Sequence, residues 1–546
     1  MYQLTNLIEN LENCLKNFDI HEKIDLKICN EKNFQFQINN LIKHKKNANI
    51  KKIFSSFNEI IEKEEVIKSF EINEKNFINL EIDIEIFSYT FENIKLVIKS
   101  KKQKNVIIDY GGPNIGKPLH VGHLRSLNIG RSLYCINSLA GNNIISDIHM
   151  GDWGMPVAQI INYINQKEIN LNELSIDKLE QIYPESSYLY SNDNDFKESA
   201  QSVNKKLNNN DKNTIKEWKI LKKISVTSLE QILKKMNYQF DLMLGESDVN
   251  HLIPKMIKRL SQENKIVIDD GAYIANIKTD PKILITKSDG SYLYLTTDLA
   301  TVLYRLKAYK FDTVIYVVDK RQELHFKQLF ECINFFEFSE ADFKHVSFGT
   351  VNDSMGNPLK TRDGGTKKLE DLLHETSNYI KNMNKDIDKQ TLDILSNTVL
   401  TFSDLITNRR TDYKFDLEKF SSISGKTGIY VQYAQVRAKK ILSKSMMVSE
   451  HKINQSELDD NDKNLLDILM NFEIHFKQAL DNNEPHHLAD YLYQISNLFN
   501  SMYQSENILE NKNDFKKINK ILITKYFVNY SLLLMESLGI SPVDKM

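Results

Sequence analysis

The sequence predicts a multidomain α/β protein in which a Rossmann-like parallel-sheet domain lies between a small N-terminal α/β domain and an all-α C-terminal domain. Its length of 546 residues exceeds that of one ordinary domain and suits three or four. Residues 106–140 place a short apolar strand, a Gly/Pro turn and a helix in succession, which is how a nucleotide-binding α/β domain begins. From about residue 370 to the end, apolar residues recur at helical spacing, which indicates an all-α region.

The first hundred residues are expected to form the N-terminal domain. A helix is predicted at its start by apolar residues at helical spacing, which are Leu4, Ile8, Leu11 and Leu15. Alternating segments at 34–37 and 77–80 follow, and the basic run 99–104 is typical of a connector. We therefore place the first domain boundary at residue 100.

The parallel-sheet domain is expected over residues 101–350. Residues 106–110 predict its first strand, and a helix is predicted from about His120 to Ala140. The segment 155–290 is interpreted as an insertion, and its polar stretch from Ser191 to Asn213 is expected to be solvated. Two further β-rich runs, each followed by helical sequence, are predicted strands: Tyr292–Thr296 and Thr313–Val318.

The C-terminal part divides into a helical connector at 351–425 and an α-helical domain at 426–546. Helical periodicity dominates this part of the chain, and no internal repeat interrupts it. The helices of the last domain are predicted at Ile429–Leu442, Leu465–Leu480 and His487–Met502.

The composition is that of a globular protein with a sizeable core, because 41% of its residues are hydrophobic and 26% are charged. No apolar run approaches the roughly 20 residues needed to span a bilayer. The start of the chain lacks the pattern of a secretory signal and is acidic for a transit peptide, so we expect a cytoplasmic protein without membrane contact. The net charge of −2 neither indicates nor excludes a nucleic-acid partner, since basic surface can be confined to one face.

The four cysteines lie far apart in the sequence, at Cys14, Cys29, Cys135 and Cys332. Their spacing argues against a zinc knuckle and against a disulfide framework. We therefore expect four free thiols, no structural zinc and no bound metal of the protein's own.

The segment His120-Val-Gly-His123 carries the strongest indication of chemistry. Two imidazoles at a helix start can donate hydrogen bonds to ATP phosphate oxygens while charge builds at the α-phosphorus. Gly122 would let adenine lie flat on the backbone, and the helix N-terminus favours the anionic phosphates. The pattern alone also fits a metal site or two unrelated histidines, although further zinc ligands at suitable spacing are missing.

The surroundings of this motif make it more specific. Asp109-Tyr-Gly-Gly-Pro-Asn-Ile-Gly-Lys-Pro-Leu-His-Val-Gly-His-Leu-Arg-Ser126, followed by His149-Met-Gly-Asp-Trp-Gly154, closely resembles the arginyl-tRNA synthetases. The histidine segment then corresponds to the HIGH signature of class I synthetases. Other stretches that share the resemblance, in the same order, are 294–298, 359–365, 408–413, 431–434 and 538–546.

The resemblance implies an enzyme that ligates L-arginine to its tRNA through arginyl-adenylate, releasing pyrophosphate and then AMP. A guanidinium ion is planar and permanently charged, so it selects carboxylates. The residues that the resemblance assigns to arginine binding are Asp109, Asn114, Tyr294, Asp298 and Gln322. Without the resemblance a lone Asp would be a surface charge or a cap, and Asp298 also fits a helix N-cap.

The resemblance assigns catalysis to His120, His123 and Lys117, with ATP and its Mg²⁺ as substrate. Further ATP contacts are implied for Gly122, His325, Lys360 and Arg362. In the second class I signature, Lys-Met-Ser-Lys-Ser, the second lysine stabilises the leaving pyrophosphate. Here Thr361 takes that place, and Lys117 is the expected substitute.

The resemblance also implies contacts with tRNA, because the last domain matches the family's anticodon-binding domain. The implied contact residues are Tyr433, Arg437, Tyr503 and Met546, together with Phe77 and Asn79 in an N-terminal domain that touches the outer corner of tRNA. Arginine neutralises phosphates and tyrosine stacks on bases. For Tyr430, Tyr491 and Tyr493, core packing is the preferred interpretation. The chain is expected to act as a monomer.

Two other functions fit part of the sequence. A small-substrate nucleotidyltransferase shares the His-x-Gly-His site but has no need of the helical C-terminal domain. A catalytically inactive, synthetase-like tRNA-binding regulator is suggested by the threonine at position 361, whereas the complete set of the other site residues argues against it.

Overall fold

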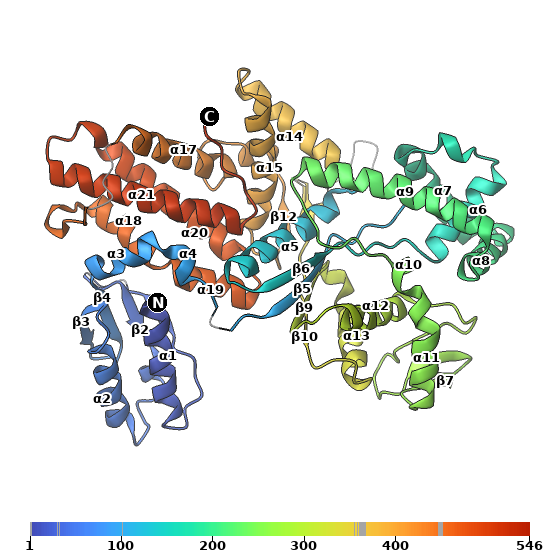
Figure 1. Cartoon of the computed structure of the whole chain (residues 1–546), viewed down its shortest axis with the longest axis horizontal. Coiled ribbons are helices and arrows are strands. Elements are labelled where there is room, and N and C mark those ends of the chain that lie inside the picture. The colour runs from blue at the N-terminus through green and yellow to red at the C-terminus, as the bar shows by residue number, and fades with distance from the viewer. Residues whose placement is uncertain are drawn as a thin grey trace. The chain divides into compact units, whose positions relative to one another are not determined.

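The computed structural model describes residues 3–29, 31, 33–100, 102–353, 355–357, 359, 367–445 and 451–546. The chain separates into two compact units, which Figure 1 shows in one view. One unit is continuous, from Lys102 to Phe420, and the other combines Met1–Lys101 with Ser421–Met546. None of the described helices is long and apolar enough to cross a membrane.

A four-stranded parallel sheet is the centre of the continuous unit. Its strands lie in the order β10-β9-β5-β6, and every neighbouring pair is parallel. They are β5 (Asn105–Tyr110), β6 (Asn143–Asp147), β9 (Thr313–Val317) and β10 (Asp342–His345). The helix α5 (Val121–Leu139) joins β5 to β6, whereas β9 is added on the other side of β5 after a long insertion. The order therefore reverses between β5 and β9, and ligands bind outside the carboxyl ends of strands at such a point.

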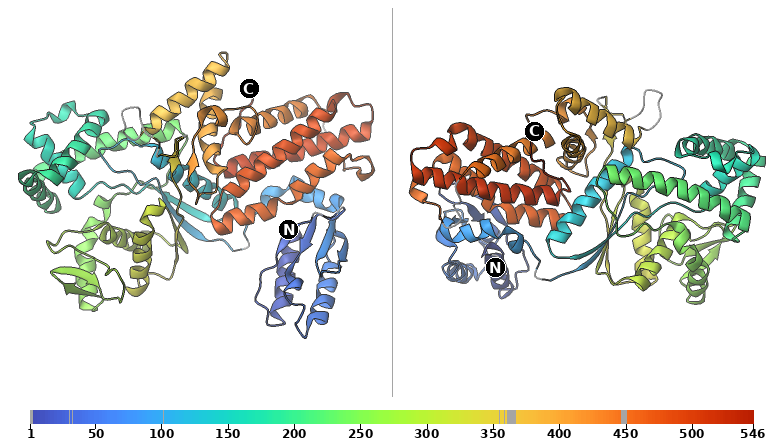
Figure 2. Two further views of the ribbon diagram at one scale, coloured as in Figure 1. Left: turned by 180° about the vertical axis from the view of Figure 1, so that it is seen from behind. Right: turned by 45° about the horizontal axis from the view of Figure 1, so that its top comes forward.

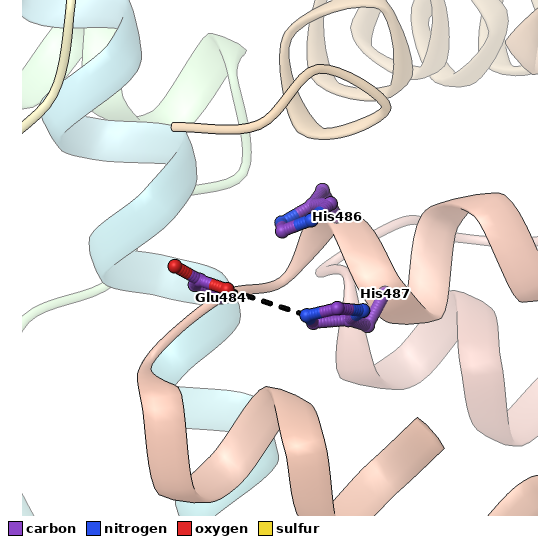
Figure 3. A group of neighbouring side chains, drawn as sticks. All are labelled: Glu484, His486 and His487. Atoms are coloured by element: carbon purple, nitrogen blue, oxygen red, sulfur yellow. Dashed lines mark hydrogen bonds and ion pairs between the residues drawn. The ribbon is translucent and has the colours of Figure 1, made fainter. Parts of the chain in front are cut away.

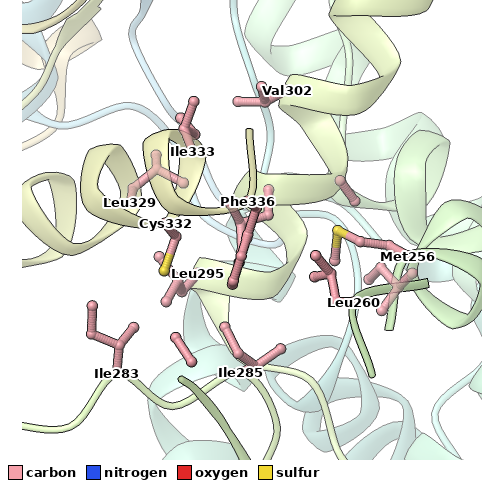
Figure 4. Close-up of a cluster of buried hydrophobic side chains, with 14 of the residues drawn as sticks. Met256, Leu260, Ile283, Ile285, Leu295, Val302, Leu329, Cys332, Ile333 and Phe336 are labelled. Carbon is pink, nitrogen blue, oxygen red and sulfur yellow. The ribbon is translucent and has the colours of Figure 1, made fainter. Parts of the chain in front are cut away.

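Helices cover both faces of this sheet. On one face Ile107, Val314 and Tyr316 pack into a core that is shared with α11 (Ile253–Gln262), α12 (Tyr294–Ala308) and α13 (Glu323–Phe335). Figure 4 shows part of this core, with Met256 and Leu260 of α11 near Phe336.

On the other face Tyr110 packs against α5. A Cβ at Gly130 would lie 2.1 Å from the ring of Tyr110, so only glycine admits this approach. The alternation of β5 thus sends Ile107 and Asp109 to the α12 face, and Ile108 and Tyr110 to the α5 face.

The insertion is mostly helical and has a core of its own. Its long helices are α6 (Met155–Gln166), α7 (Ile176–Asn192), α8 (Asn194–Asn208) and α9 (Lys212–Lys235). Most of the polar stretch from Ser191 to Asn213 lies in α8, which buries Phe196, Ala200 and Leu207 along one stripe and exposes most of its other residues. Shorter elements lead back toward the sheet: α10 (Glu246–Val249), β7 (Ile266–Asp269) and β8 (Ala272–Ala275).

The strand predicted at Tyr292–Thr296 is wrong, because α12 begins at Tyr294. The hydroxyl of Thr296 accepts a hydrogen bond from the backbone of Leu293 and donates one to the carbonyl of Ile285. These bonds close the first turn of the helix despite the β-propensity of the residues. Asp298 is consequently not the N-cap; it lies inside the helix, and Leu293 takes the N-cap position.

The connector after the sheet is tied to α5. Its helices are α14 (Leu369–Met383), α15 (Lys389–Leu405) and α16 (Leu417–Phe420), and β11 (Val351–Asn352) pairs with β12 (Tyr413–Lys414). Arg125 of α5 forms a fully buried ion pair with Asp404 of α15 at 2.8 Å. It also donates to the carbonyl of Thr411 at 2.7 Å.

In the other unit, the N-terminal residues form an antiparallel sheet in the order β1-β2-β4-β3. Its strands are β1 (Leu26–Ile28), β2 (Phe36–Ile38), β3 (Ile67–Ile72) and β4 (Ile78–Ile82). The helices of this region are α1 (Gln3–Lys16), α2 (Ile50–Ile61), α3 (Ile84–Glu92) and α4 (Ile94–Val97).

The C-terminal residues of this unit form a helical bundle. Three of its helices, α17, α20 and α21, run side by side in both views of Figure 2. Their bounds and those of the other two are α17 (Gly428–Lys444), α18 (Asp460–Met470), α19 (Phe472–Asn482), α20 (His486–Ser505) and α21 (Asp514–Ser537). Tyr491 is fully buried and donates to the carbonyl of Ile468, as the preference for core packing predicts.

Candidate active site

The start of α5 is closed by the two histidines of the sequence motif. His120 is the N-cap, and its Nδ1 accepts a hydrogen bond from the backbone N–H of Gly122 at 3.0 Å. In return, Nδ1 of His123 accepts from the backbone N–H of His120 at 3.1 Å. This reciprocal arrangement is a capping box made of imidazoles, which satisfies two backbone donors of the helix start.

These bonds assign the proton positions in the rings. A backbone N–H can only donate, so Nδ1 of each ring is assigned as the acceptor and Nε2 as the nitrogen that carries the hydrogen. Nδ1 of His123 also lies 3.3 Å from the carbonyl oxygen of His120, to which the other tautomer would donate. Burial lowers the pKa of His123 to about 3, and burial with the nearby charge of Lys117 lowers the pKa of His120. Both rings are therefore neutral at pH 7 and keep Nε2–H as a donor.

Gly122 and Lys117 flank this pair. A Cβ at Gly122 would lie 2.7 Å from the ring of His120, so a side chain there would displace the ring. The ammonium of Lys117 lies 3.7 Å from the ring centroid of Tyr183, in a cation–π contact. Desolvation lowers the pKa of Lys117.

Asp109, at the end of β5, is already paired within the protein. Nη2 of Arg305 lies 2.5 Å from its carboxylate and 2.7 Å from that of Asp147 at the end of β6. Although burial opposes protonation, Asp147 and Asp109 raise the pKa of the nearby His149. Two carboxylates, one guanidinium and one imidazole thus form a buried charge network beneath the ends of the central strands.

Asp298 and His325 are brought together from α12 and α13. Nε2 of His325 lies 2.6 Å from the carboxylate of Asp298, and both side chains are about one-quarter exposed. Gln322 ends a short 3-10 helix (Lys320–Gln322) that follows β9, and it is exposed. Asn114 is also exposed, and its backbone forms an isolated β-bridge with Gly151. A side chain at position 151 would collide with the amide oxygen of Asn114.

A cavity of about 250 Å³ opens beside Tyr294, whose side chain is 62% exposed. Glu246, which sequence reasoning missed, lines the same cavity. Burial, with the charges of Asp298 and Asp152 adding to it, raises the pKa of Glu246 to about 8. A buried carboxyl with a strongly shifted pKa in a cavity marks a candidate binding residue.

The predicted tRNA contacts of the C-terminal domain converge on Arg437. Its guanidinium carbon lies 4.1 Å from the ring centroid of Tyr433 and 5.1 Å from that of Tyr503, and Nη1 donates to Asn500 at 3.0 Å. We call Tyr433, Arg437 and Tyr503 the Arg437 cluster. Met546, 37% exposed, is the last residue of the chain.

The two predicted contacts in the N-terminal sheet differ in accessibility. Phe77 is half-buried and directly precedes β4. Asn79 is fully buried: its amide oxygen accepts from Gln37, and its amide nitrogen donates to Glu31, each at 2.7 Å. The predicted ATP contacts Lys360 and Arg362, and Thr361 between them, lie outside the described residues.

Comparison with known proteins decides the family. The catalytic-domain family described as "tRNA synthetases class I (R)" matches residues 85–417, which is more than half of the chain. The "DALR anticodon binding domain" matches residues 431–546. The chain belongs to the arginyl-tRNA synthetase family. The predictions of a class I α/β catalytic domain and a helical C-terminal domain are thereby confirmed.

Relatives of this family cover nearly the whole chain. The "Arginine--tRNA ligase" of Francisella tularensis subsp. novicida is 33% identical over 520 residues, which is 89% of each protein. The solved arginyl-tRNA synthetase from Plasmodium falciparum superposes with a TM-score of 0.82 at 26% identity and covers 100% of this chain and 98% of its own. The Thermus thermophilus enzyme, at 18% identity, shows the same fold with a TM-score of 0.81 over 99% of this chain and 100% of its own.

Proposed function

We propose that the edge of the sheet above β5, β6 and β9 is where this member of the arginyl-tRNA synthetase family ligates L-arginine to tRNA. The arginine carboxylate attacks the α-phosphorus of ATP, giving arginyl-adenylate and pyrophosphate. The 3′-terminal adenosine of tRNA then takes the arginyl group, and AMP leaves. The observation that carries this proposal is the pair of capping histidines at a helix N-terminus, whose Nδ1 atoms face the backbone and leave Nε2 as the donor toward a phosphate.

The protein's part in the chemistry is positioning and charge stabilisation. His120 and His123 donate to the phosphate oxygens, while Gly122 leaves room for the adenosine. Lys117 exchanges its contact with Tyr183 for the phosphates and takes the place of the lysine that position 361 lacks. His325, Lys360 and Arg362 complete the ATP contacts, and Mg²⁺ enters with ATP.

Recognition of arginine is assigned to the cavity beside the start of α12 and to the nearby carboxylate of Asp298. Glu246 and Tyr294 line this cavity, and the charge of Asp298 is close enough to raise the pKa of Glu246. The two carboxylates are proposed to meet the substrate guanidinium. Asn114 and Gln322 hold the amino-acid end. Asp109 contributes with only part of its charge, because Arg305 already engages one of its oxygens.

The tRNA is assigned to the other unit. The Arg437 cluster combines a cation with two aromatic faces, which suits a splayed base and its phosphate. Met546 and Phe77 are further contacts, and Asn79 joins them only if RNA displaces Glu31. Four domains are proposed. Residues 1–100 contact the outer corner of tRNA, and residues 101–350 form the catalytic domain with an insertion at about 155–290. Residues 351–425 contain the second signature and the helical connector, and residues 426–546 bind the anticodon. The enzyme is proposed to act as a cytoplasmic monomer.

Arginine-dependent exchange of pyrophosphate into ATP tests this proposal, with and without arginine tRNA. We expect exchange only with tRNA present, as the family pattern implies. His123→Ala should abolish the exchange, whereas His374→Ala, which removes an exposed histidine of the same unit, should leave it unchanged. Retained tRNA binding by folded protein with no exchange in any condition would favour the inactive regulator instead.

A further inference from the structure

Three side chains that can bind a metal converge at the junction of α19 and α20, and none of them is assigned to the reaction. Glu484, His486 and His487 each offer one ligating atom, and these atoms all lie within 4.8 Å of one another. Figure 3 shows both imidazoles beside the Glu484 carboxylate. We call these three residues the Glu484 triad.

One distance within the triad already matches a coordination sphere, and the other ligand atoms lie within 4.8 Å. Nε2 of His487 lies 3.3 Å from Oε2 of Glu484. For bonds of about 2.0–2.1 Å, two ligands of a tetrahedral Zn²⁺ lie about 3.3–3.4 Å apart. The rings of His486 and His487 are tilted by 33° with centroids 4.1 Å apart, so the two imidazoles lie next to each other at the start of α20.

The backbone holds this arrangement in place. Asn483 ends α19 in the left-handed region, at φ 53°, and Pro485 is the N-cap of α20 with φ −58°. The backbone N–H of Glu484 donates to Ala479, and that of Leu488 donates to Pro485. The Glu484 side chain is only 14% exposed and that of His487 28%, so both are partly immobilised before any ion binds. A rigid turn of this kind reduces the entropic cost of binding.

A simple ion pair between Glu484 and His487 also explains the 3.3 Å contact, and the metal titration below distinguishes it from a metal site. The charge of the helix N-terminus opposes a cation, which weakens binding by a factor of about two to five. The anionic carboxylate of Glu484 offsets this effect. Asp490, the next carboxylate along α20, is committed to Lys426 and Gln494.

We propose that the Glu484 triad binds a divalent transition-metal ion, with Zn²⁺ as the preferred ion, and thereby ties the end of α19 to the start of α20. Two imidazoles and one carboxylate are a known zinc ligand set that leaves one position for water. The sequence-based expectation of no structural zinc rested on the cysteines and on the missing ligands near His120 and His123, and the Glu484 triad was not part of that argument. The proposal does not depend on the catalytic assignment.

The test uses the full chain, dialysed against a chelator and titrated with Co²⁺ as a spectroscopic substitute for Zn²⁺. We expect one equivalent to bind at the triad with the intense visible absorption of tetrahedral coordination, and Zn²⁺ to displace it. The double variant His486→Ala/His487→Ala should weaken this binding at least about tenfold. The matched control removes two exposed histidines of the same unit, His21→Ala/His451→Ala, and should bind as the unchanged protein does.

Equal Co²⁺ binding by the unchanged protein and the His486/His487 variant would overturn the proposal, because the ion would then sit elsewhere. Glu484→Gln provides a milder variant if the double variant is unfolded. Zn²⁺ should raise the Tm of the unchanged protein, and this increase should be lost in Glu484→Gln. The same Zn²⁺-dependent increase in both proteins would equally contradict the proposal.

Discussion

Nη2 of Arg305 lies 2.5 Å from a carboxylate oxygen of Asp109. This ion pair is notable because the substrate of the family is itself an arginine. The protein therefore supplies one guanidinium of its own beside the proposed site. Because Arg305 is 0% exposed and shares a second carboxylate, Asp147, its charge is fixed rather than exchangeable with the substrate. In the proposed site, the carboxylates that Arg305 does not engage, Asp298 and Glu246, are therefore expected to carry most of the recognition of the substrate guanidinium.

Arg305→Met should lower the free energy of unfolding by about 3–5 kcal/mol, because it leaves two buried carboxylates without their cation. Arg305→Lys should lose less, since it keeps the charge but not the planar fork that spans both acids. Urea unfolding checks this prediction. Lys307→Met on the exposed side of α12 is the control, and it should change the unfolding free energy by no more than about 0.5 kcal/mol. A similar effect in both helix variants would contradict the buried network.

His123 should make the protein less stable in mild acid. Its pKa is about 3 in the folded protein against about 6.5 in the unfolded chain. Below pH 6.5 the unfolded state takes up a proton that the folded state refuses, so stability present above pH 6.5 is lost as pH falls toward 3. We expect a loss of at most about 1.4 kcal/mol per pH unit from this residue. Comparing the unfolding free energy of His123→Asn with that of the unchanged protein at pH 7 and 5 isolates the contribution.

Arginine should bind more tightly as the pH rises from 6 to 8. The pKa of Glu246 is raised to about 8, so the free site is largely protonated below that pH, whereas a guanidinium ligand favours the carboxylate. Binding then releases a proton, and affinity increases by up to about tenfold per pH unit before levelling off near pH 8. Calorimetry in buffers of different ionisation enthalpy counts the released proton. Glu246→Gln should bind weakly and without this pH dependence, and an unchanged proton count would exclude Glu246.

Asp298→Asn should raise the arginine KM by about 10–100-fold, the effect of losing a charged hydrogen bond of about 1.5–3 kcal/mol. The amide can still accept from His325, so the packing of α12 against α13 is preserved. Citrulline, which has nearly the same shape but no charge, should be discriminated less well by the variant. Steady-state aminoacylation with both amino acids provides the measurement. Unchanged discrimination would mean that the guanidinium is recognised elsewhere.

Arg437→Ala should weaken tRNA binding about tenfold and reduce the dependence of log Kd on log salt concentration by about one unit. Arg437→Lys should restore the salt dependence but not the full affinity, because lysine cannot stack between Tyr433 and Tyr503. Filter binding at several salt concentrations separates the two effects. Lys444→Ala removes a charge from the exposed end of the same helix and shows how much charge alone contributes.

The features that the sequence predicted well are those encoded by neighbouring residues. The strand at 106–110, the helix start at His120 and the spacing of Tyr433 and Arg437 on one helix all depend on local periodicity. Tyr503 joined that pair through the family resemblance, and the structure places it beside Arg437 from another helix.

Arg305 and Glu246 could not be found in the same way. Buried charges resemble exposed ones in a sequence, and their partners Asp109, Asp147 and Asp298 lie tens to hundreds of residues away. The strand predicted around Thr296 is wrong because local sequence indicated a structure that the tertiary contacts do not form. The β-branched side chain of Thr296 suggests a strand, while its hydroxyl actually closes a helix turn. Only the tertiary partner of each side chain distinguishes these cases.

Each of the two capping histidines uses its two ring nitrogens for different purposes. In each ring Nδ1 caps the start of α5, and Nε2 is the atom that the proposed reaction would use. A substitution at either position therefore affects the start of α5 as well as the proposed chemistry. Asparagine or serine would serve the cap and lose the donor at the distance of Nε2, whereas lysine or arginine would offer a donor and lose the cap. Among these side chains, only histidine provides both the cap and the donor, so a variant at either position is expected to change helix initiation and the proposed chemistry together.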